Sequence, residues 1–316
     1  MEPKRRKKGA AIVRVSPNNK QPLIVAGPTG VGKSIFAVEL ALRFGGEIIG
    51  ADAYQVYAGM GVLTAQPGPE LTSQVPHHLM GILDPSERFD AARFAAIARE
   101  TMAKICARGR RPILVGGSGL YLKALTHGLA ELPPVDPALR AELSALSPDE
   151  LRERLDRADP EARRHIDFQN PRRVLRALEI HHQTGRTTAR QRELWDAPPT
   201  LEHDGILLVR ERTELMARIE ENVRTMLTQN VVEEVMALGE IGPTAAMAIG
   251  LREIQALARG EATREETQRA ITLATGRYAK RQLTWFRNQF SFNSMDLTGL
   301  RNVGEFPFNA FFPELA

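Results

Sequence analysis

One stretch near the start of the chain has the residue types and spacing of a phosphate-binding loop. An apolar run at 23–26 leads into the pattern G-x-x-x-x-G-K-S, and an amphipathic run at 35–44 follows it. Glycines let the backbone bend so that successive N–H groups point at phosphate oxygens, and the start of a helix adds partial positive charge. The lysine supplies a mobile full charge, and the serine supplies a hydroxyl suited to Mg²⁺. The stretch therefore predicts a polyphosphate site, without saying which polyphosphate. Its members are Gly27, Pro28, Thr29, Gly30, Val31, Gly32, Lys33 and Ser34.

A carboxylate follows the next strand candidate. Residues 47–51 form this candidate and end at Asp52, and a glycine-rich turn at 116–119 follows a third candidate at 112–115. The carboxyl ends of parallel strands meet at one edge of a sheet, so we expect Asp52 and this turn to lie beside the phosphate loop. A carboxylate near a polyphosphate can handle an ion or a proton. The alternative is a helix cap or a turn residue.

The elements that must position these groups alternate between strands and helices. A helix capped by Asp90 precedes the strand candidate at 112–115, and another strand candidate lies at 206–209. Such alternation predicts an α/β fold, a P-loop nucleoside-triphosphate-hydrolase-like parallel sheet flanked by helices. The prolines near 133 and the arginine-rich, helix-forming stretch that follows predict an inserted helical subdomain. We expect a disordered basic arm at 1–20, a core at 21–132 and 201–290, the insertion at 133–200, and a tail at 291–316 whose phenylalanines pack back on the core.

Composition sets the class of protein and its surroundings. The chain has 316 residues, of which 43% are hydrophobic and 25% are charged, and this is ordinary globular composition. A single cysteine, Cys106, excludes both a disulfide framework and a cysteine-based zinc site, so we expect a reducing, cytoplasmic location. No apolar run reaches membrane-spanning length. The net charge of +4 is equally compatible with an anionic partner and with a solvated basic surface.

Two basic clusters suit contact with nucleic acid. Arginines at 172, 173 and 176 follow Asn170 and Pro171 at a helix start, where guanidinium groups one turn apart can meet phosphates or base edges. Near the end of the last long helix, basic and aromatic residues recur at helical spacing. The arginines between 152 and 164 are interleaved with acids, so we interpret them as a solvated helix face.

Seven motifs in order resemble the tRNA dimethylallyltransferases. The resemblance spans about residues 22–290 and is more specific than the phosphate loop alone. After that loop come D-x-x-Q-V-Y from Asp52, T-A-Q-P from Thr64, P-H-H-L from Pro76, V-G-G-S-G-L-Y from Val115, N-P-R-R from Asn170 and K-R-Q-L-T-W-F-R from Lys280.

The resemblance implies a reaction. Members of this family move a dimethylallyl group from dimethylallyl diphosphate to N6 of the adenosine at position 37, beside the tRNA anticodon. The phosphate loop would then hold the diphosphate of the donor rather than ATP, with Lys33 and Mg²⁺ neutralising the leaving group. Asp52 matches the family's base for the amino proton, and Thr64 matches a threonine near the donor.

The resemblance also implies contacts with the anticodon stem-loop of tRNA. We expect the protein to be a monomer that has no membrane partner. The matching positions are Asp52, Ala53, Tyr54, Gln55, Ser118, Arg140, Arg172, Arg173, Val174, Leu175, Arg176, Met247, Gly250, Arg252, Lys280, Arg281, Gln282, Trp285 and Arg287.

The chain departs from the family pattern at several positions, and two other functions stay open. A serine, a glycine, an arginine and a tyrosine common in the family are replaced by Ala53, Leu63, Asn222 and Leu251.

One alternative function is that of an adenylate isopentenyltransferase that accepts free AMP, ADP or ATP. The other is a P-loop kinase or an NTP-dependent RNA-binding protein. The helical insertion and the basic last helix favour tRNA, because a free nucleotide needs neither.

Overall fold

The computed structural model describes residues 16, 21–129 and 136–312. The basic arm expected at 1–20 lies outside these residues except for Ser16. The chain divides into two compact units, the first formed by Met1–Leu125 and Glu202–Ala316 and the second by Thr126–Leu201. The second unit begins earlier than the expected insertion, at Thr126, whose carbonyl accepts hydrogen bonds from the N–H groups of Thr200 at 2.8 Å and Leu201 at 3.0 Å.

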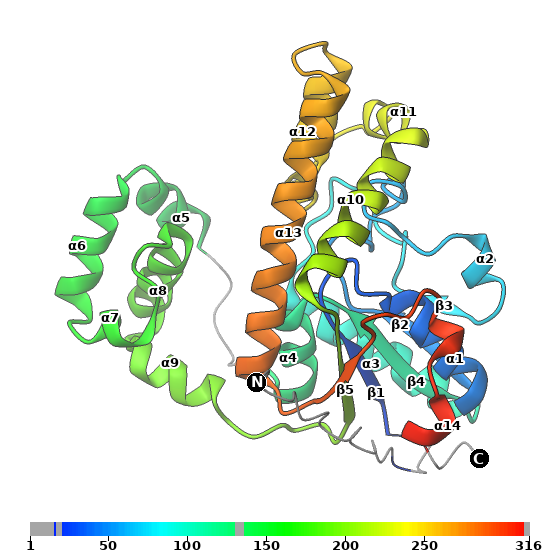
Figure 1. Ribbon diagram of the computed structural model, residues 1–316. Coiled ribbons are helices and arrows are strands. Elements are labelled where there is room, and N and C mark those ends of the chain that lie inside the picture. The colour runs from blue at the N-terminus through cyan, green and yellow to red at the C-terminus, as the bar shows by residue number, and fades with distance from the viewer. Residues whose placement is uncertain (1–15, 17–20, 130–135, 313–316) are drawn as a thin grey trace, which may run out of the picture. The chain divides into compact units, whose positions relative to one another are not determined.

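A six-stranded sheet forms the centre of the first unit (Figure 1). All its strands are parallel, in the order β3-β2-β4-β1-β5-β6. Every residue of β1, β2 and β4 is buried, because helices cover both faces of the sheet. The predicted α/β fold is therefore confirmed. The strands are β1 Leu23–Ala26, β2 Gly46–Gly50, β3 His77–His78, β4 Arg111–Gly116, β5 Asp204–Val209 and β6 Asn293–Asp296.

The helix that the sequence predicted before the strand candidate at 112–115 is α3, Ala91–Ala107. Asp90 accepts hydrogen bonds from the N–H groups of Ala92 and Arg93, which makes it the expected cap. The last long helix, α13, packs against α10 and α12, and Figure 1 shows it in orange along the unit. The helices are α1 Lys33–Phe44, α2 Pro69–Thr72, α3 Ala91–Ala107, α4 Gly119–His127, α10 Arg212–Thr228, α11 Val231–Met236, α12 Leu251–Ala258, α13 Arg264–Gln289 and α14 Phe308–Phe311, with 3₁₀ turns η1 Ala245–Met247 and η2 Val303–Glu305.

The C-terminal segment returns to the core, as the sequence predicted. Phe306, Phe308 and Phe312 are buried, and their rings contact Phe36 and Phe44 of α1. The segment also adds β6 to the edge of the sheet, a strand that the sequence did not predict.

The second unit has an apolar core of its own. Its described residues form helices and no strand, as the arginine-rich sequence predicted. The core contains Leu139, Leu143, Leu151, Leu155 and Phe168, among others. The helices are α5 Pro137–Ser144, α6 Pro148–Ala158, α7 Ala162–His165, α8 Pro171–Thr184 and α9 Thr188–Trp195. No helix in the described part of either unit is both long and apolar enough to cross a bilayer.

Candidate active site

The predicted phosphate loop, residues 27–34, connects β1 to α1. Gly30 and Gly32 have φ angles of 83° and 107°, a left-handed conformation that favours glycine. Helix α1 begins at Lys33, so the N–H groups of its first turn have no partner inside the helix. The ammonium group of Lys33 donates to the carbonyl of Pro28 at 2.9 Å. The loop therefore has the backbone bend, the helix start and the cation that a polyphosphate site needs.

Burial changes the electrostatics of Lys33. Loss of solvent lowers the pKa of Lys33 from 10.5 to about 8, and the negative charge of Asp52 offsets only part of this effect. A bound anion would restore the charged form, because an opposite charge close by favours it.

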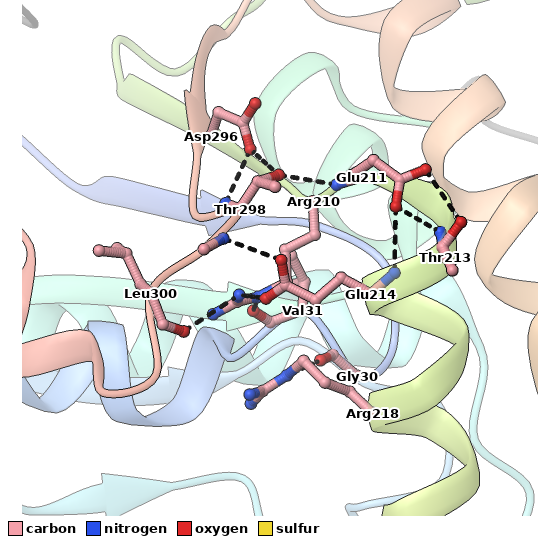
Figure 2. A network of polar contacts seen from close by, with 11 residues as sticks. Gly30, Val31, Arg210, Glu211, Thr213, Glu214, Arg218, Asp296, Thr298 and Leu300 are labelled. Atoms are coloured by element: carbon pink, nitrogen blue, oxygen red, sulfur yellow. Dashed lines mark hydrogen bonds and ion pairs between the residues drawn. The ribbon is translucent and has the colours of Figure 1, made fainter.

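Two arginines hold the phosphate loop through its backbone carbonyls (Figure 2). The Nε group of Arg210 donates to the carbonyl of Val31 at 3.1 Å, and the Nε group of Arg218 donates to the carbonyl of Gly30 at 3.0 Å. Burial and the charge of Arg210 lower the pKa of Arg218. These hydrogen bonds fix the carbonyls of Gly30 and Val31, and Arg218 also lines the phosphate cavity.

The chain beyond β6 completes the surroundings of Arg210. This buried arginine pairs with Glu214 and donates to the carbonyl of Leu300 at 3.3 Å. The N–H group of Gly299 donates to Glu214 at 2.8 Å, and the N–H group of Glu211 donates to the hydroxyl of Thr298 at 2.8 Å. Sequence reasoning missed Arg210, although a charged residue directly after a buried strand is a usable signal.

Asp52 follows β2 and serves as both a turn residue and a cavity residue. Its carboxylate accepts a hydrogen bond from the N–H group of Tyr54 at 3.0 Å, and it lines both cavities described below. The hydroxyl of Ser118 accepts a hydrogen bond from the N–H group of Ala53 at 3.0 Å. The turn role expected as the alternative for Asp52 is therefore observed, and the same residue lines both cavities.

Thr64 lies on a turn that amide and carboxylate side chains hold in place. Its hydroxyl donates to the carbonyl of Met60 at 2.6 Å. The side chain of Gln55 donates to the carbonyls of Thr64 at 3.2 Å and Ala65 at 2.9 Å, and Glu234 accepts from the two N–H groups that precede Thr64. Ala65 has a φ of 52°, so this turn stays in a conformation unusual for alanine.

Two cavities of different character adjoin at these residues. One, of about 300 Å³, is lined by the phosphate loop and by Arg218. The other, of about 120 Å³, has a largely apolar lining that includes Leu63, Ile219, Val223, Met226 and Ile271. The arrangement suits a ligand with a phosphate head and a small apolar tail. Thr29, Asp52, Thr64, Ala65 and Asn222 line both cavities.

A Mg²⁺ ion would find few protein ligands here. In the described parts of the chain, no three His, Cys, Asp or Glu side chains gather into a metal site. Ser34 lines the phosphate cavity and offers a single hydroxyl. This donor set fits Mg²⁺, which is often held by few protein groups together with substrate phosphates and water.

The residues predicted to contact RNA on α13 lie on different sides of that helix. Lys280, Arg281 and Arg287 are exposed, whereas Gln282 is buried. Trp285 is half-buried, and its ring edge lies against the backbone of Gly119. The exposed cations can therefore meet an external polyanion, while Gln282 faces the site.

Other predicted contacts lie around the cavities and near α12. Tyr54 lines the apolar cavity. Met247 and Arg252 are exposed, and Gly250 is the N-cap of α12 with a φ of 95°.

In the second unit, the predicted arginines divide into exposed and paired groups. Arg172 and Arg173 are exposed at the start of α8. Arg140 and Arg176 both pair with Glu179, whose side chain is only 1% exposed. Val174 is fully buried and Leu175 packs against the apolar core, so these two side chains serve the core of this unit.

The fold and the cavities define a class, a P-loop α/β protein whose phosphate loop opens beside a small apolar cavity. Comparison with known proteins narrows the class. A model of the IPP transferase family matches residues 55–289. The chain is 44% identical over 279 residues to a tRNA dimethylallyltransferase of Syntrophobacter fumaroxidans, with 84% of this chain and 80% of the relative covered. It is 42% identical over 267 residues to the enzyme of the same name in Akkermansia muciniphila, with 84% and 90% covered.

Solved structures agree with this result. A tRNA isopentenylpyrophosphate transferase from Bacillus halodurans is 36% identical with a TM-score of 0.65, and the match covers 89% of this chain and 91% of that one. A eukaryotic dimethylallyltransferase acting on tRNA is 25% identical with a TM-score of 0.75, covering 93% of this chain and 77% of that one. The chain belongs to the IPP transferase family.

Proposed function

We propose that this protein transfers the dimethylallyl group of dimethylallyl diphosphate to N6 of the adenosine at position 37 of tRNA, beside the anticodon. The products are N6-isopentenyladenosine and diphosphate. One observation carries the proposal: a phosphate cavity and an apolar cavity share the side chains of Thr29, Asp52 and Thr64. A diphosphate in the first cavity and a five-carbon group in the second place the bond to be broken at these residues.

The phosphate loop handles the leaving group. Negative charge grows on the diphosphate as the allylic C–O bond breaks, and Lys33, Arg218 and the loop N–H groups are positioned to stabilise it. Ser34 would hold a Mg²⁺ ion against the donor phosphates, and the ion would add positive charge to the leaving group when bound. The apolar cavity excludes water from the allylic carbon, which favours transfer over hydrolysis.

Asp52 handles the acceptor. The lone pair of the adenine amino group forms the new C–N bond while the C–O bond to diphosphate breaks, and the amino group must then lose a proton. In this proposal Asp52 accepts that proton, and its position in the lining of both cavities supports the role.

The exposed cations favour an RNA acceptor over a free nucleotide. Lys280, Arg281 and Arg287 along α13 are suited to the backbone of an anticodon stem-loop. A base in such a loop is accessible when it is unstacked and turned into a pocket, as in other enzymes that act on bases.

The test uses purified protein, Mg²⁺ and labelled dimethylallyl diphosphate, with unmodified tRNA, the same tRNA carrying guanosine at position 37, or AMP. We expect label only in the unmodified tRNA. The Asp52→Asn variant keeps an oxygen for the Tyr54 N–H group but loses the base, so its rate should fall on the order of 10²-fold or more.

Label in AMP would identify an adenylate isopentenyltransferase instead. Label in the guanosine-containing tRNA would contradict transfer to N6 of adenosine 37, and an Asp52→Asn variant with the wild-type rate would contradict the proposed base.

A further inference from the structure

One buried side chain of α13 connects two loops of the site. Gln282 is only 5% exposed. Its side-chain oxygen accepts hydrogen bonds from the N–H group of Thr29 at 2.9 Å and from the Thr29 hydroxyl at 3.2 Å. Its side-chain nitrogen donates to the carbonyl of Gly117 at 3.1 Å. The same amide therefore holds the phosphate loop and the turn after β4.

The glycines of that turn make room for α13. A Cβ atom at Gly117 would lie 2.0 Å from the amide nitrogen of Gln282, and one at Gly119 would lie 2.1 Å from the ring of Trp285. Contacts this short cannot exist, so the turn lacks side chains where the helix approaches. This second glycine-rich stretch thus serves the close approach of a helix.

The turn continues the connection to Asp52. Ser118 follows Gly117, and its hydroxyl accepts the hydrogen bond from Ala53, the residue after Asp52. The N–H group of Ser118 also donates to the carbonyl of Ala51, the residue before Asp52, at 3.3 Å. Gln282 is therefore bonded directly to the phosphate loop, and through two consecutive residues to both sides of the proposed base.

We propose that Gln282 is a positioning residue that fixes the separation between the phosphate loop and the turn that carries Asp52. The proposal rests on the proposed function, because that separation sets where donor and acceptor meet. A misplacement of about 1 Å can lower a rate on the order of 10²-fold. The sequence led us to expect that Gln282 contacts RNA, and this proposal assigns it a role inside the site instead.

The first variant is Gln282→Leu, which keeps a similar shape and removes both hydrogen-bonding groups. We expect single-turnover transfer at saturating substrates to fall by roughly 10- to 100-fold, and pyrophosphate to bind several-fold more weakly. Affinity for tRNA should stay within about twofold, because the exposed cations of α13 are unchanged. Asn288→Ala removes an exposed amide from the same helix and should match the wild type.

The second variant, Gln282→Glu, gives a readout that general loss of folding would not. Its carboxylate accepts from Thr29 but cannot donate to Gly117, whereas the protonated acid can do both. Burial favours the neutral form of a carboxyl group, so the protonated fraction should grow as the pH is lowered. The transfer rate relative to the wild type, measured well below the melting temperature, should therefore rise as the pH is lowered from about 8 to about 6.

Two results would overturn the proposal. One is a wild-type transfer rate in Gln282→Leu. The other is a transfer rate of Gln282→Glu, relative to the wild type, that does not change with pH while only the melting temperature falls. Failure of the proposed function is separate, since the wild type itself would then transfer no label to tRNA. Even if the wild type transfers no label, the affinity of the Gln282→Leu variant for pyrophosphate would still test whether the hydrogen bonds of Gln282 to Thr29 hold the phosphate loop.

Discussion

At the scale of single residues, Lys33 lacks a full counter-charge until an anion arrives. Its burial lowers the pKa to about 8, and a bound diphosphate would raise that pKa again. Below pH 8 the free protein already carries the proton, so this group adds no pH dependence to binding. Above pH 8 a proton must be taken up with the ligand, so affinity falls as the pH rises.

This gives a prediction for pyrophosphate. Its affinity for the wild type should decline between about pH 8 and pH 10, approaching tenfold per pH unit once the effect of pyrophosphate's own ionisation has been subtracted. Titration calorimetry in buffers of different ionisation enthalpy would measure the proton uptake. Lys33→Met should bind more weakly at pH 7 and lose this extra decline. An equal pH dependence in both proteins would contradict the assigned pKa.

Single residues also show which parts of the site the sequence could predict. Lys33 was found from the glycine-rich pattern between a strand and a helix, and Asp52 from its place just beyond a strand, so local pattern and sheet topology bring them together. The contacts of Arg210 and Gln282 with the phosphate loop span 179 and 253 positions of sequence. Local pattern can mark Arg210 as a charged residue after a strand but carries no information about such distant partners, so Arg210 was missed and Gln282 was expected to contact tRNA.

At the scale of elements, the junction of β5 and α10 supports the phosphate loop. Arg210 directly follows the strand, Glu214 lies in the first turn of the helix, and Gly299 and Leu300 contact the pair. A buried ion pair that loses one partner leaves an uncompensated charge, and this usually costs more than removing both partners.

We therefore predict that Arg210→Met lowers the free energy of unfolding by about 3 kcal/mol, the low end for a buried pair because Glu214 is partly exposed. The double variant Arg210→Met with Glu214→Gln should lose less. Urea denaturation measures both, and pyrophosphate binding should weaken in each because the carbonyl of Val31 loses its donor. Equal stability of Arg210→Met and the wild type would refute this account.

Edge strands explain the elements that the sequence missed. Only one of the four residues of β6 is buried, so the strand lacks a strong apolar pattern, and its place depends on pairing with β5. Strand β3 has only two residues and pairs with β2 alone. The central strands were predicted because burial on both faces makes them continuous apolar runs.

At the scale of the whole molecule, the two units have separate cores, and the second unit begins and ends at adjacent backbone positions. The carbonyl of Thr126 bonds to the N–H groups of Thr200 and Leu201. Insertions whose ends are this close leave the host domain's chain path nearly unchanged.

Replacing residues 127–199 by two glycines should therefore leave a folded first unit. We expect its pyrophosphate affinity to stay within about threefold of the full protein, since the loop and its supports all lie in that unit. Affinity for tRNA should fall by at least about tenfold, because the exposed arginines of α8 are lost. Loss of pyrophosphate binding in a folded deletion protein would contradict this division of roles.

The close approach of α13 to the turn after β4 also constrains how the protein can evolve. A side chain gained at Gly117 would occupy the space of Gln282, and one gained at Gly119 would occupy the space of Trp285. Neither glycine can therefore change first. The facing residue of α13, Gln282 or Trp285, must first be replaced by a smaller residue. The intermediate protein then lacks the contact of the original side chain and has no new side chain in its place. Each pair therefore needs two successive substitutions, so these glycines should persist even where the residues proposed to contact RNA diverge.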